Sequence, residues 1–224
     1  IRWTGRFFSG ACGTGCPARS PHGWVHGGPG NVLLSGLRRH CHLLRPAHRK
    51  PLQIVHPDAP RRIQRRSILD AARDKRIYPT LQRLAASEQI VSLYQGPTAT
   101  QLAAVAPYLV CLGTSDRVFD WIWQNGWGDS WGVFLWSLVS VDTLRSHFRR
   151  LTMAQGPDRR RMLFRFYDPR VMREFLPICD AEQCREMFGP VAQFSYETEA
   201  ADAIVVARAR DGQMATRTVP LLSE

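Results

Sequence analysis

The sequence lacks several features that would place a protein quickly in a functional class. No apolar run reaches the roughly 18 residues that a membrane-spanning helix needs, so no membrane association is expected. The basic start continues into Gly, Cys and Pro instead of the apolar core of a signal peptide. Residues 67–224 contain neither a phosphate-binding loop nor a dinucleotide fingerprint. These observations argue against membrane proteins, secreted proteins and the common nucleotide enzymes.

Cysteine is scarce, with six in 224 residues and no regular spacing. Free thiols are typical of reducing compartments, so we expect a cytoplasmic protein. One metal site is conceivable, because Cys12, Cys16, His22 and His26 supply C-x3-C and H-x3-H halves. Only five residues separate the halves, against about twelve in a zinc finger. We therefore expect no metal and no other cofactor, with zinc kept as an alternative.

Acidic residues are almost missing from residues 1–66, where twelve Lys and Arg accompany a single acid, Asp58. This segment also holds six of the seven histidines and shows no hydrophobic periodicity. It cannot bury enough apolar surface to offset an ordering cost of about 1–2 kcal/mol per residue. We expect a disordered basic tail or, because the first residue is Ile1, an over-extended gene start. Nucleic-acid binding by the tail is a less favoured alternative, because few aromatic residues accompany its charges.

Residues 67–224 have the pattern of a folded domain and carry no net charge, with 18 basic and 18 acidic residues. Strand-like runs alternate with segments whose apolar residues recur at helical spacing. This alternation predicts the α/β class, with a mixed, mostly layered sheet and alternating helices. Asp211-Gly212 between two β-prone runs predicts a C-terminal antiparallel hairpin.

Residues with capping side chains predict where several helices begin. Helices are expected from Asp74, from Thr98 and from Asp180, the last two with a glutamine three residues later as in a capping box. Helical spacing predicts two buried faces, formed by Val118, Phe119, Ile122 and Trp123 and by Leu144, Phe148 and Leu151.

The segment around Asp168 carries the densest pattern in the chain. Residues 162–167 alternate as a strand does, Asp168 can cap a helix, and Pro169 suits the first helical position. Arg165 and Arg170 flank the junction. Because a guanidinium offers a planar fork of donors to a carboxylate, we predict a buried Asp–Arg pair that holds this corner. A ligand-binding or catalytic Asp–Arg site is the alternative.

The sharpest enzyme motif is GDSWG, residues 128–132, which matches the G-x-S-x-G elbow of serine hydrolases. That motif needs a strand before the serine and a helix after it, whereas here the predicted order is reversed. The single histidine outside the tail, His147, precedes Asp168, although the hydrolase order is Ser, acid, His. A lone helical histidine more often packs than catalyses. We expect no enzyme and no catalytic residue, with a hydrolase using Ser130 as the alternative.

Five of the seven tryptophans fall within residues 121–136. They could pack in the core, or lie on the surface as tryptophans do in protein-interface hot spots.

Seven segments then occur in a recognisable order: SILDAARDKRIYPTL, SLYQG, VAPYLVCL, GWGDSWGVFLWS, LRSHFRRL, MLFRFYDPRVMREFLP and MFGPV. Together, over about residues 68–200, they resemble the bacterial type VI secretion adaptor family, a domain of unknown function described as effector chaperones. The resemblance implies that residues 67–224 are a non-enzymatic cytoplasmic adaptor domain. Such a protein binds a secreted effector protein and helps to load it onto the VgrG spike protein.

The resemblance also marks individual positions as family signature or partner surface. These are Asp70, Trp131, Gly132, Ser137, His147, Arg149, Arg150, Arg165, Tyr167, Asp168, Pro169 and Arg170.

Overall fold

The computed structural model describes residues 2–3, 63–113, 117–155 and 159–221. All of these residues fall in the same one of two compact units of the chain. The zinc alternative at Cys12, Cys16, His22 and His26 lies outside the described residues, as does nearly all of the basic tail.

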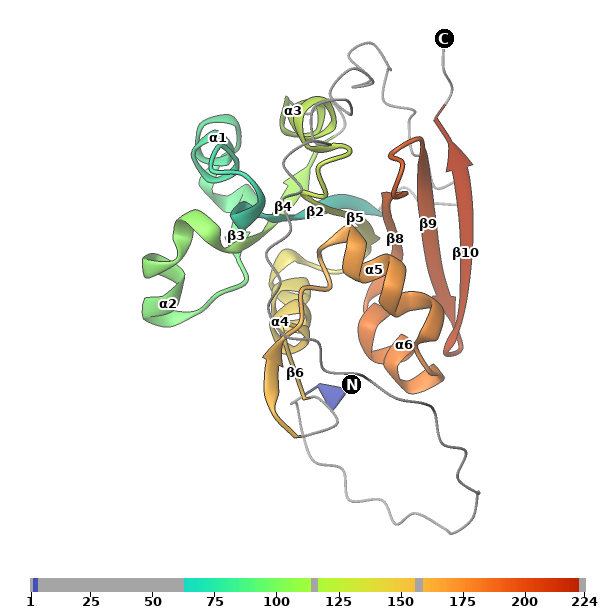
Figure 1. Cartoon of the computed structure of the whole chain (residues 1–224). Helices are drawn as coiled ribbons and strands as arrows, with labels where there is room; N and C mark the ends of the chain where they lie inside the picture. The colour runs from blue at the N-terminus through green and yellow to red at the C-terminus, as the bar shows by residue number, and fades with distance from the viewer. Residues whose placement is uncertain (1, 4–62, 114–116, 156–158, 222–224) are drawn as a thin grey trace, which may run out of the picture. The chain divides into compact units, whose positions relative to one another are not determined.

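The described residues form a seven-stranded sheet in which every neighbouring pair is antiparallel (Figure 1). The predicted α/β class with layered helices and a C-terminal hairpin is thus confirmed, and the antiparallel pairing extends from the hairpin across the whole sheet. In spatial order the strands are β10 (Gln213–Pro220), β9 (Ala203–Arg210), β8 (Val191–Glu197), β5 (Gly132–Ser137), β2 (Gln64–Asp70), β4 (Pro107–Leu112) and β3 (Ile90–Ser92).

The central strands β2 and β5 are buried on both faces because apolar side chains alternate between two cores. Ile68 and Val133 lie in one core, whereas Leu69 and Phe134 lie in the other. The sheet is therefore the middle layer of three.

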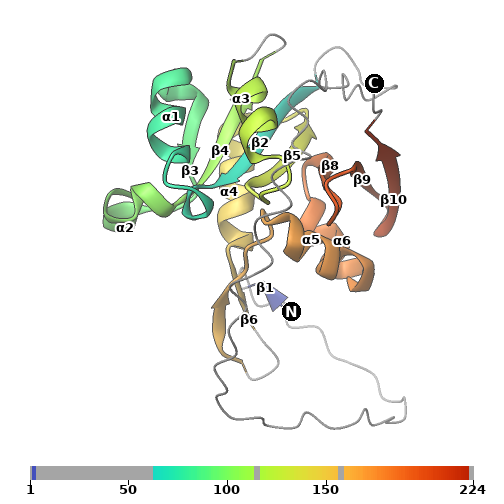
Figure 2. The ribbon, with the colours of Figure 1, turned by 45° about the horizontal axis from the view of Figure 1, so that its top comes forward.

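Helices cover both faces of the sheet (Figures 1 and 2). The core with Leu69 is covered by α1 (Ile77–Leu84) and α3 (Arg117–Gly126). The core with Ile68 is covered by α4 (Val141–Leu151), α5 (Pro169–Phe175) and α6 (Ala181–Phe188). A short helix, α2 (Gly96–Gln101), joins β3 to β4.

A second, three-stranded sheet joins β1 (Arg2–Trp3), β6 (Met153–Gln155) and β7 (Arg161–Leu163), in that order. Strand β1 pairs antiparallel with β6, so at least these two residues of the expected tail are ordered against the domain.

Local patterns predicted several elements correctly. Asp180 caps α6 in a capping box with Gln183. Asp211 and Gly212 both have positive φ, the geometry of a tight hairpin turn between β9 and β10. The seven apolar residues expected on the inward faces of α3 and α4 are all buried.

Three element boundaries differ from the sequence-based expectations. Helix α1 starts at Ile77, because Asp74 instead accepts a bond from the Arg76 N–H just before the helix. Helix α2 starts at Gly96, with Pro97 in its first turn, so Thr98 is not its cap. The strand expected over residues 162–167 ends at Leu163, because the consecutive residues 166–168 are all buried and break the alternation.

The central strand β2 includes residues that precede residue 67, the expected start of the domain. Strand β2 begins at Gln64, and Arg66 is fully buried within it. Composition placed this arginine in the tail because its charge resembles the residues before it.

The tryptophans of residues 121–136 belong to the core. Trp123, Trp127, Trp131 and Trp136 are buried, and the partly buried Trp121 packs against Trp131 in a tilted arrangement with ring centroids 4.9 Å apart. An interface role for this tryptophan group is therefore not supported by its burial.

Candidate functional site

Asp168 sits at the corner where the chain enters α5, as the sequence predicted. Its Oδ1 accepts a bond from the Arg170 N–H at 2.9 Å, which caps the helix, and Pro169 occupies the first turn. The Arg170 guanidinium also grips the carboxylate, with Nη2 2.6 Å from Oδ2 and Nε 3.0 Å from Oδ1. Burial alone would raise the pKa of Asp168, but the bonds and charge of Arg170 outweigh it and lower the pKa.

Asp70 forms a second buried acid at the end of β2. Its Oδ1 accepts a bond from the Ala72 N–H at 3.0 Å and so begins the 3₁₀ turn η2 (Ala71–Arg73). Its Oδ2 lies 3.4 Å from Arg165 Nη1, which comes from the chain just before α5. Burial raises the pKa of Asp70, and the Ala72 bond and the Arg165 charge offset only part of that effect.

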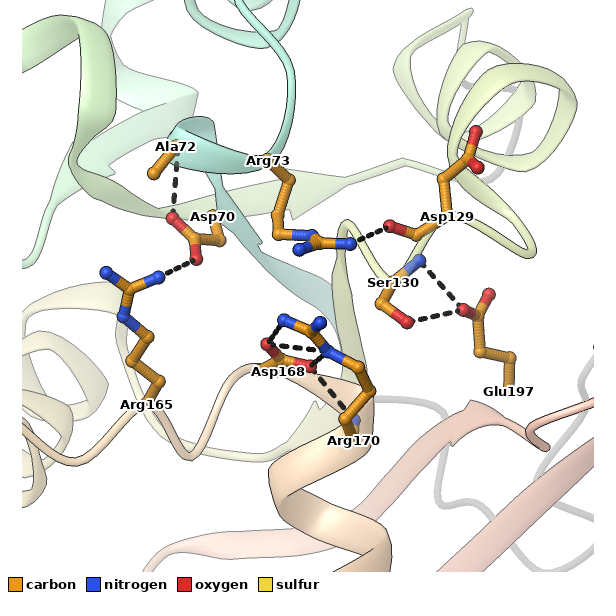
Figure 3. Close-up of polar contacts among 9 residues, drawn as sticks. All are labelled: Asp70, Ala72, Arg73, Asp129, Ser130, Arg165, Asp168, Arg170 and Glu197. Carbon is orange, nitrogen blue, oxygen red and sulfur yellow. Dashed lines mark hydrogen bonds and ion pairs between the residues drawn. The ribbon is translucent and has the colours of Figure 1, made fainter. Parts of the chain in front are cut away.

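The two acids and their arginines make one group of charges (Figure 3). Arg73 completes it, because its charge acts on both Asp70 and Asp168 while its Nη2 donates to Asp129 O at 3.0 Å. We call this group, Asp70, Arg73, Arg165, Asp168 and Arg170, the acid–arginine cluster. It links the end of β2 to the start of α5.

Arg165 therefore does not share Asp168 with Arg170, although both flank it in sequence. Arg165 reaches Asp70, which lies 95 positions away, and Arg170 alone holds Asp168. The predicted Asp–Arg pair is confirmed for Arg170, and the partner of Arg165 is a finding of the tertiary structure.

Tyr167 lies buried beneath this cluster, and Tyr94 lies near it. Burial raises the pKa of both phenols, and the Asp70 charge raises them further. Arg149 fixes the chain at Tyr94 by donating to the carbonyl oxygens of Ser92, Leu93 and Tyr94 at 3.1–3.4 Å. Arg149 therefore supports the cluster through the backbone.

A third buried acid, Glu197, closes the GDSWG turn. Its carboxylate accepts bonds from the N–H groups of Gly128 and Ser130 at 2.6 and 2.8 Å, and from Ser130 Oγ at 3.1 Å. Burial raises the pKa of Glu197, and these bonds reduce the rise. Ser130 has a φ of 54°, a left-handed conformation that the turn imposes.

The order of elements around Ser130 is the reverse of a hydrolase elbow, with α3 before it and β5 after it. His147 does not bond to Ser130, because its Nε2 lies 3.2 Å from Met187 O and its buried ring packs against Gly189. Burial lowers the pKa of His147 to about 4, so the ring is neutral at pH 7. His147 packs α4 against the end of α6.

The remaining signature positions serve the sheet or face solvent. The Trp131 carbonyl accepts the Asp70 N–H at 2.8 Å, and Ser137 Oγ donates to Pro190 O at 2.7 Å. A Cβ at Gly132 would lie 2.0 Å from Ile68 O, so only glycine fits there. Arg150 is exposed on α4.

Sequence reasoning missed two residues of these sites, Arg73 and Glu197. Arg73 follows Asp70 closely in the segment DAARD, a short run of charges that could have suggested it. Glu197 ends a strand and has no local pattern that points to Ser130, its partner 67 positions away.

Two searches of the described residues bear on other kinds of site. No group of three or more His, Cys, Asp or Glu side chains within them could hold a metal ion. None of the helices in the described part of the chain is long and apolar enough to cross a membrane.

Comparison with known proteins gives the family. Residues 67–186, more than half of the chain, match the family DUF4123, a domain of unknown function. The chain therefore belongs to the DUF4123 family, whose matched region includes the whole acid–arginine cluster. Neither the curated proteins nor the solved structures provide a match.

Proposed function

We propose that this protein is a non-enzymatic adaptor of a bacterial type VI secretion system, which binds a secreted effector protein in the cytoplasm and helps to load it onto the VgrG spike protein. The observation that carries the proposal is membership of the DUF4123 family over residues 67–186, together with the seven ordered segments that resemble the adaptors. The resemblance supplies the partners, an effector and VgrG, and includes neither a membrane nor a nucleic acid among them.

The chemistry of the signature residues supports a binding role over turnover. His147 and Ser137 bond to backbone carbonyl groups and hold elements together. The acids Asp70 and Asp168 bond to backbone N–H groups and to arginines, which leaves them fixed in place. Such an arrangement suits a surface that recognises a protein partner.

The test is a secretion assay in the source bacterium with the gene deleted and then restored. We expect an effector encoded nearby to disappear from the secreted fraction on deletion, while another effector of the same secretion system persists. The full-length tagged protein should co-purify with the lost effector or with VgrG. Normal secretion of every effector in the deletion strain would refute the adaptor function.

A serine hydrolase remains the second candidate, because Ser130 has a left-handed backbone and its hydroxyl bonds to the buried carboxylate of Glu197. A hydrolase predicts that Ser130→Ala abolishes turnover of an ester such as p-nitrophenyl acetate without unfolding the chain. Ser146→Ala, at an exposed serine of α4, is the matched control. The adaptor proposal predicts that the wild type and both variants give the same background rate.

A further inference from the structure

The acid–arginine cluster turns its arginines outward and its acids inward. The side chains of Arg165 and Arg170 are 46% and 52% exposed, whereas those of Asp70 and Asp168 are 2% and 3% exposed. A molecule that approaches this surface meets guanidinium groups, and the carboxylates beneath are out of reach.

The arginines are also held in place before any partner arrives. Arg170 donates to both oxygens of Asp168, Arg165 Nη1 donates to Asp70 Oδ2, and Arg73 Nη2 donates to the carbonyl oxygen of Asp129 (Figure 3). Immobilising a flexible side chain on binding costs about 0.5–1.5 kcal/mol. Because much of this ordering is already present in the free protein, the cluster can use its donors with a smaller entropic loss.

The charges leave a positive excess at this surface. Three arginines against two carboxylates leave one formal positive charge in the cluster. Within the described residues, Arg73 donates to a backbone carbonyl, while the two carboxylates of the cluster bond to Arg165 and Arg170. The Asp129 side chain points away from the Arg73 guanidinium (Figure 3). Nearby, Asp74 forms its own ion pair with Arg76. An acidic group of a partner would therefore find unmatched positive charge and prepared donors.

We infer that the acid–arginine cluster is a docking surface for an acidic peptide segment of a protein partner, whose Asp or Glu carboxylates bind Arg73, Arg165 and Arg170. Guanidinium groups favour carboxylates because two parallel N–H donors match two oxygens. The inference rests on the proposed adaptor function, to which it adds the chemistry of the segment that is recognised.

Arg73 is the residue to change, because its removal leaves Asp70 and Asp168 with their own arginine partners. The probe is a fluorescein-labelled hexaglutamate peptide, and its binding to the full chain is measured by fluorescence anisotropy. We expect Arg73→Gln to weaken binding about two- to fivefold, the range of a partly exposed ion pair. Arg73→Glu should weaken it further, because it adds repulsion.

Arg217→Glu is the matched control, because Arg217 is an exposed arginine on β10 and the change in charge is the same. If the peptide bound to the basic tail instead, Arg73→Glu and Arg217→Glu would change its affinity equally. The difference between the two variants therefore reports on the cluster. Equal affinity of Arg73→Glu and Arg217→Glu for hexaglutamate would overturn the inference. If Arg73→Glu lowers the thermal midpoint, Arg73→Gln and Arg73→Lys are compared, and Lys should bind more tightly than Gln.

A phosphate ligand is the competing outcome. If Arg73→Gln weakens binding of a labelled oligothymidylate but not of hexaglutamate, the cluster binds phosphates and the inference is wrong. The adaptor function itself is tested separately by the secretion assay. Loss of effector secretion on deletion, together with no effect of Arg73→Glu on the peptide, would refute the docking surface and leave the adaptor intact.

Discussion

Two substitutions at Asp168 distinguish the contribution of the helix cap to stability from that of the ion pair. Asp168→Ala removes the cap of α5, whose loss costs about 1 kcal/mol, together with the bonds to Arg170. The ion pair adds about 0–1 kcal/mol, because Arg170 is 52% exposed and water screens it. We expect Asp168→Ala to lower the free energy of unfolding by about 1–2 kcal/mol.

Asp168→Asn keeps an oxygen that can accept the Arg170 N–H, since Asn and Asp cap helices about equally well. It removes the charge and replaces Oδ2, the acceptor of the Arg170 Nη2–H, by an amide N–H₂. Because Arg170 is half exposed and its donors can turn to water, the cost should stay below about 1 kcal/mol. Urea denaturation of the full chain, followed by tryptophan fluorescence, gives both values. Glu199→Ala, at an exposed acid in the loop after β8, is the control and should change stability by less than about 0.5 kcal/mol.

The pH dependence provides a check on the same residue. The pKa of Asp168 is lowered in the folded protein, so its charge contributes stability that is present above the ordinary value of 3.8. This contribution is lost as the pH falls through the folded pKa, and the difference between wild type and Asp168→Asn should shrink there. If Asp168→Asn is as destabilising as Asp168→Ala at pH 7, the cap is not the main contribution and the reasoning fails.

Three further predictions concern the rest of the framework. Glu197→Gln should lower the free energy of unfolding by about 1–3 kcal/mol, because an amide N–H₂ would replace one of the acceptors of the GDSWG turn; an unchanged urea midpoint would contradict this. Gly132→Ala should lower the free energy of unfolding by about 1–3 kcal/mol or more, because the added Cβ would collide with Ile68 O. Thermal melting measures this loss. The pKa of His147 is lowered to about 4, so the stability it contributes is present above pH 6.5 and is lost as the pH falls towards 4. His147→Gln should reduce this slope in urea titrations at pH 7 and pH 4.5, and an unchanged slope would mean that His147 is not buried in neutral form.

Features that depend on neighbours in the chain could be predicted from the amino-acid sequence. Three such features are the cap at Asp168, the capping box at Asp180 and the hairpin turn at Asp211-Gly212. Each involves residues within about four positions, so the residues that form the sequence pattern are also the residues that interact. Family membership was also readable from the sequence, because the ordered segments span most of the matched region. The expectations at Asp74 and Thr98 failed at two helices whose N-cap residues, Arg76 and Gln95, make no side-chain cap bond.

Contacts between residues far apart in the sequence became visible in the folded structure. Composition and periodicity carry no information about register, so they did not show that β2 lies between β4 and β5, or that all the strands are antiparallel. The pairing of Arg165 with Asp70 spans 95 positions, and that of Glu197 with Ser130 spans 67. The Glu197–Ser130 pair forms because β8 lies beside β5 in the sheet. The Arg165–Asp70 pair forms because the segment between β7 and α5 reaches the end of β2, and the orientation of the arginines follows from burial of the acids. The candidate docking surface therefore exists only in the folded chain.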